Sequence, residues 1–515
     1  MAVALGIEGR TGRRTNLAFD RLMVSIDSFN YRNNMPARER RTLYSRNVAL
    51  RLEAFRGNRE SSDRLEIAMI NADLANGSLA MDGFAWEPLP GAFADSLGLR
   101  ELELDTLRLD GVDWRAFLTG GDAVVRRMLV KGLRVGMNEV SSGDSITATP
   151  ATPAALVPVG RWVLERTLRT VNRGVRLDAF SAQQVRVTQP IDGSDAVVQA
   201  DSLSLGGVLF GFDPAQWDGP IPLGPLTLSA SGVGRDWREN HTGLEHLSLD
   251  LAQGTALVSG LTHGPLGSDA DFVRRQRWRT DRVRIEVDTL KLEQLDAPAW
   301  VRHGAYRVGM VRAEGLDLDV YNDKRLPARR RTSTHRFPQE WFRTSGVDLH
   351  VDSIRARGRV AYRERSATAS RTGSLRFENL DATVVNLGTD GSRMIGDSSI
   401  RLSATTRLMG TGALSTRVEI PVFSPTFEMR WSGQLGRMNV TDLNQLVTGI
   451  SDLRISSGEI ERITFSAVTR NGTSRGSLVP RYRDLAVEAP GMARSGILQG
   501  LRRAVVKFAA NQFVV

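Results

Sequence analysis

The 515-residue sequence contains no cysteine and only six histidines. The absence of cysteine excludes thiol catalysis, disulfide scaffolds and cysteine-ligated zinc or iron–sulfur sites. The histidines are scattered and show no HExxH pattern, so we predict no metal site and no cofactor.

Catalytic motifs are missing as well. No GxSxG, GxxxxGK[ST] or GxGxxG motif occurs in the strand–turn–helix context that each requires. The sequence therefore predicts no catalytic residues, and we expect a protein that is not an enzyme.

Lysine is scarce, although the chain is basic with a net charge of 68 − 58 = +10. The only lysines are Lys131, Lys291, Lys324 and Lys507, so arginine supplies nearly all of the positive charge. Many arginines alternate with apolar residues, which is typical of a solvated sheet face, and we expect no nucleic-acid partner. The Arg-rich residues 324–343 are punctuated by proline and indicate an exposed basic loop, with phosphate binding as an open alternative.

Long apolar runs are also absent, so no segment is predicted to span a bilayer as a helix. The first residues, MAVALGIEGRTGRR, lack the basic-then-apolar order of a secretion signal. Strand-like sequence begins almost at once, which leads us to expect that the natural start of the protein lies elsewhere.

The most informative feature present is an eight-residue pattern, apolar-x-apolar-Asp-[Ser/Thr]-apolar-x-apolar. It occurs five times, starting at Val24, Leu102, Val198, Ile285 and Leu349. Three copies are followed at one fixed distance by a second strand, which starts at Gly132, Gly315 or Asn379. Such self-similarity indicates one supersecondary unit used repeatedly and stacked on its neighbours.

The alternation of apolar residues changes parity at the Asp-[Ser/Thr] step. A strand has period two, so this change would move the second half to the other face unless one extra residue is absorbed there. We therefore predict a bulge or bend at each repeat aspartate, which are Asp27, Asp105, Asp201, Asp288 and Asp352. The alternative is that each aspartate separates two short strands with no shared face.

The pattern predicts a mainly β fold with a few short helices. The expected architecture is elongated and repeat-built, a curved antiparallel sheet that forms a U-shaped hydrophobic groove. Its predicted lining is Val24, Ile26, Phe29, Leu102, Leu104, Leu107, Leu109, Val198, Leu203, Leu205, Ile285, Val287, Leu290, Leu292, Leu349, Val351 and Ile354. In the alternative, these residues pack against helices or a second sheet and form a dry core.

Four segments show helical periodicity, residues 122–129, 160–172, 441–450 and 495–513. The last is basic and amphipathic, and it could lie on an anionic membrane or cap an open sheet end. Its candidate membrane-surface residues are Ile497, Leu498, Leu501, Arg502, Arg503, Val505, Lys507 and Phe508.

These signals divide the chain into six segments. We expect amino-terminal groove repeats over 1–146, a linker or hinge over 147–158, and a middle helix with further repeats over 159–323. The basic loop over 324–343, a carboxy-terminal β region over 344–490 and the amphipathic helix over 491–515 complete the division.

The carboxy-terminal β region resembles the AsmA-like proteins of the bacterial envelope, a superfamily that includes TamB and YhdP. A Ser-Gly start, an Asn-Gly turn, a glycine and a Tyr-x-Asp-Leu ending recur there at similar spacing. They are matched here by Ser457-Gly458, Asn471-Gly472, Gly476 and Tyr482 to Leu485. Residues 285–324 resemble another unit of the same proteins, so the resemblance covers about residues 285–487.

The resemblance implies a membrane-associated β-groove that carries phospholipid between the inner and outer membranes, through the periplasm. The expected partners are a phospholipid or other acyl lipid, and a membrane or envelope protein at one or both ends. The sequence lacks the family's amino-terminal anchor helix and stops at Val515, so we expect a fragment of an anchored protein. The alternative is a structural scaffold or adhesin-type surface protein with a closed, dry core. The sequence leaves the oligomeric state open.

Overall fold

The computed structural model describes residues 3–8, 14–32, 45–59, 63–88, 99–118, 123–139, 174–191, 194–211, 227–296, 299, 305–328, 347–367, 371–389, 399–423, 428–451, 453–470 and 473–488. The chain divides into two compact units, Met1–Arg238 with Gly243–Gly254 (unit 1) and Glu239–Thr242 with Thr255–Val515 (unit 2). The predicted linker over 147–158 and the predicted helices over 160–172 and 495–513 lie outside the described residues.

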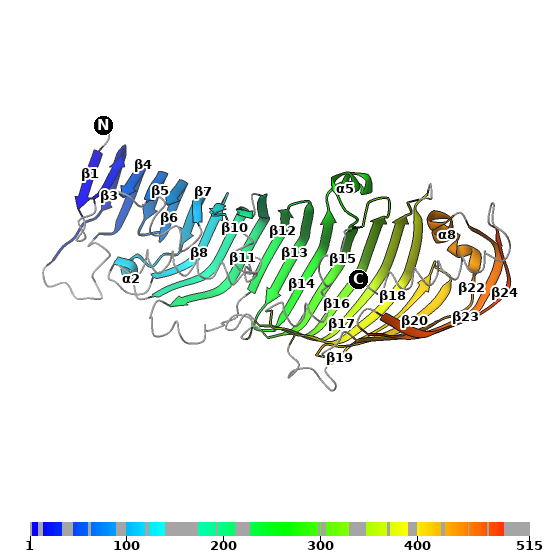
Figure 1. Ribbon diagram of the computed structural model, residues 1–515. Helices are drawn as coiled ribbons and strands as arrows, with labels where there is room; N and C mark the ends of the chain where they lie inside the picture. Colours follow the sequence, from blue (N-terminus) through cyan, green and yellow to red (C-terminus); the bar gives the residue numbers. More distant parts are fainter. Residues whose placement is uncertain are drawn as a thin grey trace. The chain divides into compact units, whose positions relative to one another are not determined.

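Unit 1 is built from strands that pair mostly with their neighbours in the chain (Figure 1). The strands are β1 (Val3–Glu8), β2 (Arg14–Phe19), β3 (Arg21–Asp27), β4 (Asn47–Arg59), β5 (Asp63–Asp73), β6 (Ser78–Pro88), β7 (Leu99–Asp110), β8 (Ala123–Lys131), β9 (Arg134–Met137), β10 (Gly174–Ile191), β11 (Ser194–Gly211), β12 (Thr227–Trp237) and most of β13 (Asn240–Asp250). A short helix, α2 (Trp114–Leu118), lies against β8.

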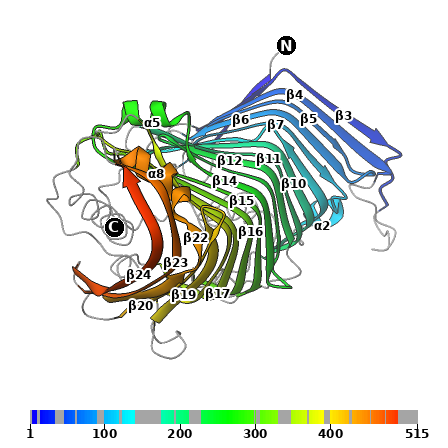
Figure 2. The same cartoon turned by 90° about the vertical axis from the view of Figure 1, so that its right-hand side faces the viewer.

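Unit 2 continues in the same style, and its strands curve visibly in Figure 2. They are β14 (Thr255–Pro265), β15 (Asp281–Leu295), β16 (Tyr306–Asp323), β17 (Leu349–Arg365), β18 (Gly373–Gly388), β19 (Ser399–Leu408), β20 (Gly412–Pro421), β21 (Glu428–Leu435), β22 (Met438–Asn439), β23 (Arg454–Arg470) and β24 (Thr473–Glu488). The helices are α5 (Asp269–Arg275), η4 (Val440–Leu443) and α8 (Asn444–Ile450). The prediction of a mainly β protein with a few short helices is confirmed.

The sheets are mixed, so the prediction of an antiparallel sheet is wrong in part. β10 pairs in parallel with β8 and β9, and β16 pairs in parallel with β17, whereas pairs such as β10 with β11, β15 with β16 and β17 with β18 are antiparallel. Parallel neighbours need a connection long enough to return the chain to the same end of the sheet. Residues 138–173 and 324–348, which include the predicted linker and basic loop, are these two connections.

Two local predictions have opposite outcomes. The helix expected over 122–129 is wrong, because this segment forms β8. Its valines favour a strand, and Val130 lies opposite Leu107 of β7. The helix expected over 441–450 is confirmed by η4 and α8. The expected Asn-Gly turn at 471–472 lies outside the described residues, and the strands on either side of it pair with Arg470 opposite Thr473.

The repeat aspartate Asp288 occupies a special place between two neighbouring strands. The register of the flanking pairs places it level with Gly260 of β14 and Gly315 of β16, whose φ values are +61° and +70°. A Cβ on Gly315 would come within 2.0 Å of the Asp288 Oδ2 atom. The aspartate side chain therefore fills the space that a left-handed, side-chain-free residue leaves open.

The same arrangement recurs in unit 1, where two further repeat aspartates each lie between two left-handed residues. These opposing residues are Gly83 and Gly132 for Asp105, and Gln184 and Gly232 for Asp201. The strand register stays constant through all three aspartates, so the extra residue predicted there is not absorbed within these pairs. The bend comes instead from the left-handed residues of the neighbouring strands. On those strands the alternation of side chains changes parity at the same level as on the strand that carries the aspartate.

The other two repeat aspartates sit in different surroundings. Asp352 lies opposite Asn386 of β18, which has a φ of +67°. Asp27 ends β3 and is followed by Ser28, with a φ of +55°. A left-handed residue therefore adjoins every repeat aspartate, on a neighbouring strand in four copies and next in sequence in one.

Bulges do occur where a strand whose side-chain alternation changes parity pairs with a strand whose alternation stays regular. Between β16 and β17 the register shifts from Ala313 to Leu316, while β17 advances by only two residues. β16 therefore absorbs one extra residue at Gly315 relative to β17, which keeps a regular alternation there.

The arginines of β17 show that charged side chains stay on the same face of the sheet on both sides of this bend. Arg357 lies 3.6 Å from Glu314, and Arg359 forms an ion pair with Asp317. The two arginines share one face of β17, so Glu314 and Asp317 share that face of β16 although they are three residues apart. In an unbroken strand they would point to opposite sides.

A core cluster gives the same result for the bend at Asn386. Val384 and Leu387, which flank this residue, both pack against the buried pair Ile400 and Val422. Both therefore lie on one face of β18. Left-handed residues thus keep apolar side chains on one side of the sheet while the sequence changes parity.

This geometry predicts a stability cost for adding a side chain at a bend. Gly315→Ala should lower the free energy of unfolding by about 2 kcal/mol, because alanine resists a positive φ and its Cβ meets Asp288. Gly436→Ala is the matched control, since a Cβ there meets only Ala413 at ordinary distances. Urea denaturation measures both, and equal stability of the two variants would contradict the assignment.

Candidate functional site

The apolar side chains of β15 and its neighbours form one continuous surface in unit 2, here called the apolar face. Cross-strand pairs define it on both sides of the bend at Asp288. They are Val283 with Val320, Ile285 with Leu318, Leu290 with Ala313 and Leu292 with Val311. β17 and β18 extend the face with Ile354, Ala356, Val360, Val384, Ala382, Leu380 and Phe377.

Toward the carboxy-terminal strands the apolar face carries aromatic residues. The rings of Trp431 on β21 and Phe465 on β23 lie 5.7 Å apart. Phe465 covers Gly433, because a Cβ there would lie 2.4 Å from the ring. Leu478 of β24 lies opposite Phe465 and is 46% exposed, so this part of the face reaches solvent.

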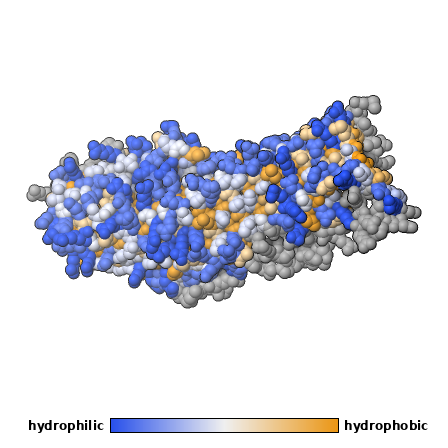
Figure 3. All heavy atoms as spheres, turned by 180° about the vertical axis from the view of Figure 1, so that it is seen from behind, coloured by the Kyte–Doolittle hydropathy of each residue, from blue (hydrophilic) through white to orange (hydrophobic). Residues whose placement is uncertain are grey.

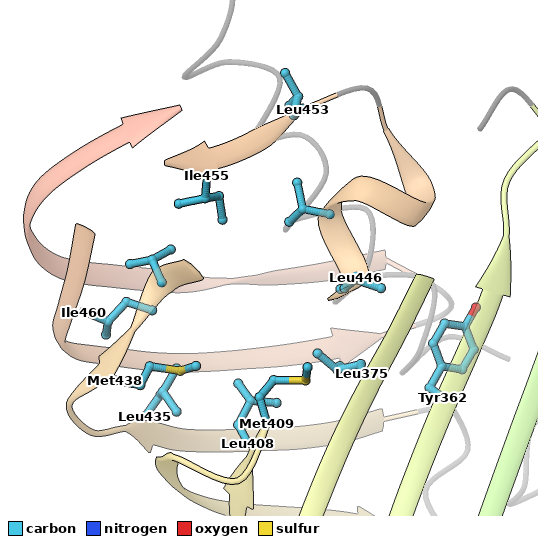
Figure 4. Packing of buried hydrophobic residues seen from close by; sticks show 12 residues of the cluster. Tyr362, Leu375, Leu408, Met409, Leu435, Met438, Leu446, Leu453, Ile455 and Ile460 are labelled. Carbon is cyan, nitrogen blue, oxygen red and sulfur yellow. The ribbon is translucent and has the colours of Figure 1, made fainter. Parts of the chain in front are cut away.

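One end of the apolar face is closed by α8. Figure 4 shows Leu446 of this helix among side chains from the strands around it. The buried cluster comprises Tyr362, Leu375, Leu408, Met409, Leu435, Met438, Val440, Leu446, Val447, Leu453, Ile455 and Ile460. Gly449 contacts the backbone of Gly373 so closely that a Cβ on Gly449 would lie 2.1 Å from the Gly373 nitrogen. The helix is therefore seated directly on β18, and this end of the face is a dry core.

Elsewhere the apolar face is not sealed by a second sheet of described strands. Described strands contact each other broadly only where they are paired, apart from a small contact between β20 and β22. Of the 17 predicted lining residues, only Val287 and Val351 are buried. Val24, Ile26, Phe29 and Val198 are exposed, and the remaining eleven are half-buried, as expected for one layer of side chains on a sheet.

The predicted lining residues of unit 1 form a comparable surface there. Leu102, Leu104, Leu107 and Leu109 lie opposite Trp86, Phe84, Met81 and Leu79. Leu203 and Leu205 lie opposite Ala182 and Phe180. Figure 3 shows hydrophobic patches interspersed with hydrophilic surface on one face of the molecule. Val24 and Ile26 of β3 are 52% and 56% exposed.

Sequence reasoning missed the aromatic residues of these surfaces. Phe84, Trp86, Phe377, Trp431 and Phe465 belong to strands outside the repeat pattern. Alternation with polar neighbours, as in Glu428-Met-Arg-Trp-Ser432, could have placed Trp431 on an apolar strand face. The predicted membrane-surface residues, Ile497 to Phe508, lie outside the described residues.

The opposite surface, here called the polar face, is held together by arginine–carboxylate pairs. Asp381 accepts hydrogen bonds from Arg355 at 2.8 Å and from Arg357 at 3.2 Å. The Arg355 guanidinium lowers the pKa of Asp381, and the Arg359 guanidinium lowers that of Asp317. These carboxylates are therefore ionised at neutral pH and are poor general acids.

A partly buried ion cluster lies at the ends of β16 and β17. Asp323, which is 1% exposed, accepts hydrogen bonds from the Arg325 side chain at 2.9 Å and from Tyr321 at 3.3 Å. Lys324 and Tyr362 approach Glu364 at 2.5 and 2.7 Å. Each carboxylate is thus paired with its own cation and its own hydroxyl donor. We therefore assign the cluster a structural role.

The described part of the chain contains no candidate site for metal chemistry. No group of three or more His, Asp or Glu side chains is placed there to hold a metal ion. Within the same residues, no helix combines the length and apolarity needed to cross a bilayer.

No protein-family model and no curated protein matches the sequence.

The ion cluster predicts how stability depends on pH. The Arg325 hydrogen bond lowers the pKa of Asp323 in the folded chain. This carboxylate therefore stabilises the fold above its unfolded pKa of about 3.9, and the contribution is lost as pH falls through the lower, folded value. Asp323→Asn should lower the free energy of unfolding at neutral pH by about 2 kcal/mol and weaken its loss on acidification.

Denaturation at a series of pH values tests this expectation. Glu461→Gln is the control, because Glu461 is exposed and has no ion pair in the described part of the chain. An Asp323→Asn protein as acid-sensitive as the wild type would overturn the assignment.

Proposed function

We propose that the protein is a non-enzymatic, AsmA-like envelope protein whose apolar face carries the acyl chains of phospholipid between the inner and outer membranes. The observation that carries the proposal is the continuity of the apolar face across the bend at Asp288. A surface that changed sides at each bend would offer no unbroken path for a hydrocarbon chain.

The physical argument concerns the cost of moving a lipid through water. Each methylene exposed to water costs about 0.8 kcal/mol, so a chain of about sixteen carbons costs on the order of 12 kcal/mol. A strip of half-buried side chains such as Ile285, Leu318 and Val360 removes much of this cost along its length. No specific pocket is required, which agrees with the absence of a convergent polar cluster on the apolar face of the described strands.

Curvature supports the same proposal. A sheet that curves around its apolar face, as the U-shaped groove of the prediction does, would shield a bound chain from water on more than one side. Left-handed residues placed at matching levels on successive strands interrupt the ladder at the bend, but the register is the same on both sides of it. In this proposal, the bends at the repeat aspartates form the groove wall.

A scaffold with a dry core remains the competing function, and one observation favours it. The cluster beneath α8 is fully packed, which shows that this chain can bury its apolar face against its own elements. The two functions differ in what occupies the remaining part of the face, either lipid or further protein.

Mass spectrometry of organic extracts from the purified protein distinguishes them. We expect phospholipid in stoichiometric amount. Lipid-free protein with little binding of a hydrophobic dye would favour the scaffold.

A matched pair of variants localises the lipid. Ile354 lies on the apolar face and its neighbour Ser353 on the opposite face of β17, and both are half-buried. A charge in contact with hydrocarbon is costly, so Ile354→Asp should reduce co-purified lipid several-fold, whereas Ser353→Asp should retain it. Circular dichroism checks that both variants fold, and equal lipid content in the two folded variants would contradict the proposed path.

A further inference from the structure

The polar face of unit 2 has an open depression of about 700 Å³ over β18 to β24. Its side chains fall into two neighbouring cross-strand rows. The first row is Arg401, Glu419, Arg430, Val468 and Arg475, and the second is Ser403, Arg417, Ser432 and Ser466. These residues alternate with the apolar-face residues Leu402, Val418, Trp431 and Ala467 of the same strands, so the depression lies behind the apolar face.

The positive charge of this depression is only partly neutralised. Arg430 approaches Glu428 at 2.8 Å and Glu419 at 3.7 Å, and these contacts satisfy it. In the described part of the chain, no carboxylate lies within ion-pair distance of Arg417 or Arg475. Two exposed guanidinium groups therefore border the depression without an ion-pair partner among the described residues.

Hydroxyl groups occupy the space between these two arginines. Ser432 of β21 and Ser466 of β23 are directly opposed and both are exposed. β20 and β24, which carry Arg417 and Arg475, are the next strands on either side, so the four strands span about 14 Å. A group seated over the two serines would lie between the arginines.

We propose that this depression binds a phosphate ester group. A phosphate ester presents up to three acceptor oxygens and carries one to two negative charges. Two forked guanidinium groups and the hydroxyls of Ser432 and Ser466 supply matching donors, and the Ser466 hydroxyl also shares a hydrogen bond of 3.1 Å with Ser477. Arginine pairs with phosphate through two parallel hydrogen bonds. A carboxylate has only two acceptor oxygens, whereas a phosphate monoester has three non-bridging oxygens and a diester adds two ester oxygens to its two non-bridging ones.

Lipid headgroups and free phosphorylated molecules share this chemistry. The site lies on the face opposite to the proposed acyl path, so it does not depend on that function. A lipid bound here would belong to a membrane surface against which the polar face rests, because its acyl chains could not reach the apolar face of the same sheet.

Binding assays with the whole chain test the proposal. Inorganic phosphate and glycerol 3-phosphate are titrated by calorimetry, and co-sedimentation compares vesicles of phosphatidylglycerol with vesicles of phosphatidylcholine. The test variant is Arg417→Gln/Arg475→Gln. The control is Arg407→Gln/Arg462→Gln, which removes the same charge from exposed residues outside the depression.

We expect the wild type to bind glycerol 3-phosphate, phosphatidylglycerol vesicles or both. The test variant should bind at least about tenfold more weakly, because each charge-assisted hydrogen bond contributes at least about a factor of ten. The control should bind as the wild type does. Binding to vesicles alone assigns the headgroup as the source of the phosphate, and binding to the soluble ester assigns a free ligand. Failure of every probe to bind, or equal weakening in both variants, would overturn the proposal.

Discussion

Steric complementarity between an aspartate and a left-handed residue on the next strand is the constraint on which both sheets depend. At Asp288 the side chain occupies the position that a Cβ of Gly315 would need, so the glycine is obligatory and the bend is fixed. Because the register is the same on both sides of this pair, the two strands change parity together and resume their hydrogen-bonded ladder beyond the bend. A strand whose alternation does not change parity at this level, such as β17, pairs with β16 through a bulge.

The separation of the two faces follows from this constraint. Ion pairs of Arg357 and Arg359 with residues on both sides of Gly315 hold the polar face together across the bend. The apolar face is continuous for the same reason, and it ends where α8 seats on β18 through Gly449. The proposed lipid path and the proposed phosphate site thus lie on opposite sides of one layer, each built from alternate residues of the same strands.

The sequence predicted the strands and the bends because both leave local patterns. The parity change at Asp288 could be read directly, since period-two alternation is the strongest signal of a strand. The sequence also placed Gly315 at a fixed distance of 27 residues after Asp288. The left-handed conformation of this glycine and its contact with Asp288 could not be predicted, because they arise only when the two strands pair. Parallel pairing of β16 with β17 was missed because nothing in a connecting sequence states to which end of the sheet it returns. Val124 and Val125 show the remaining difficulty, since a short apolar segment fits helix and strand alike until its neighbours are known.

The most direct test of the account uses the absence of cysteine, because a single introduced cysteine can carry a unique spin label. Labels at Ala313, Glu314, Leu316 and Asp317 of β16 would be compared for accessibility to oxygen, which prefers apolar surroundings, and to a water-soluble nickel complex. The account predicts that Ala313 and Leu316 report the apolar face, and that Glu314 and Asp317 report the polar face. Unbroken alternation, with Ala313 grouped with Asp317 and Glu314 grouped with Leu316, would contradict it.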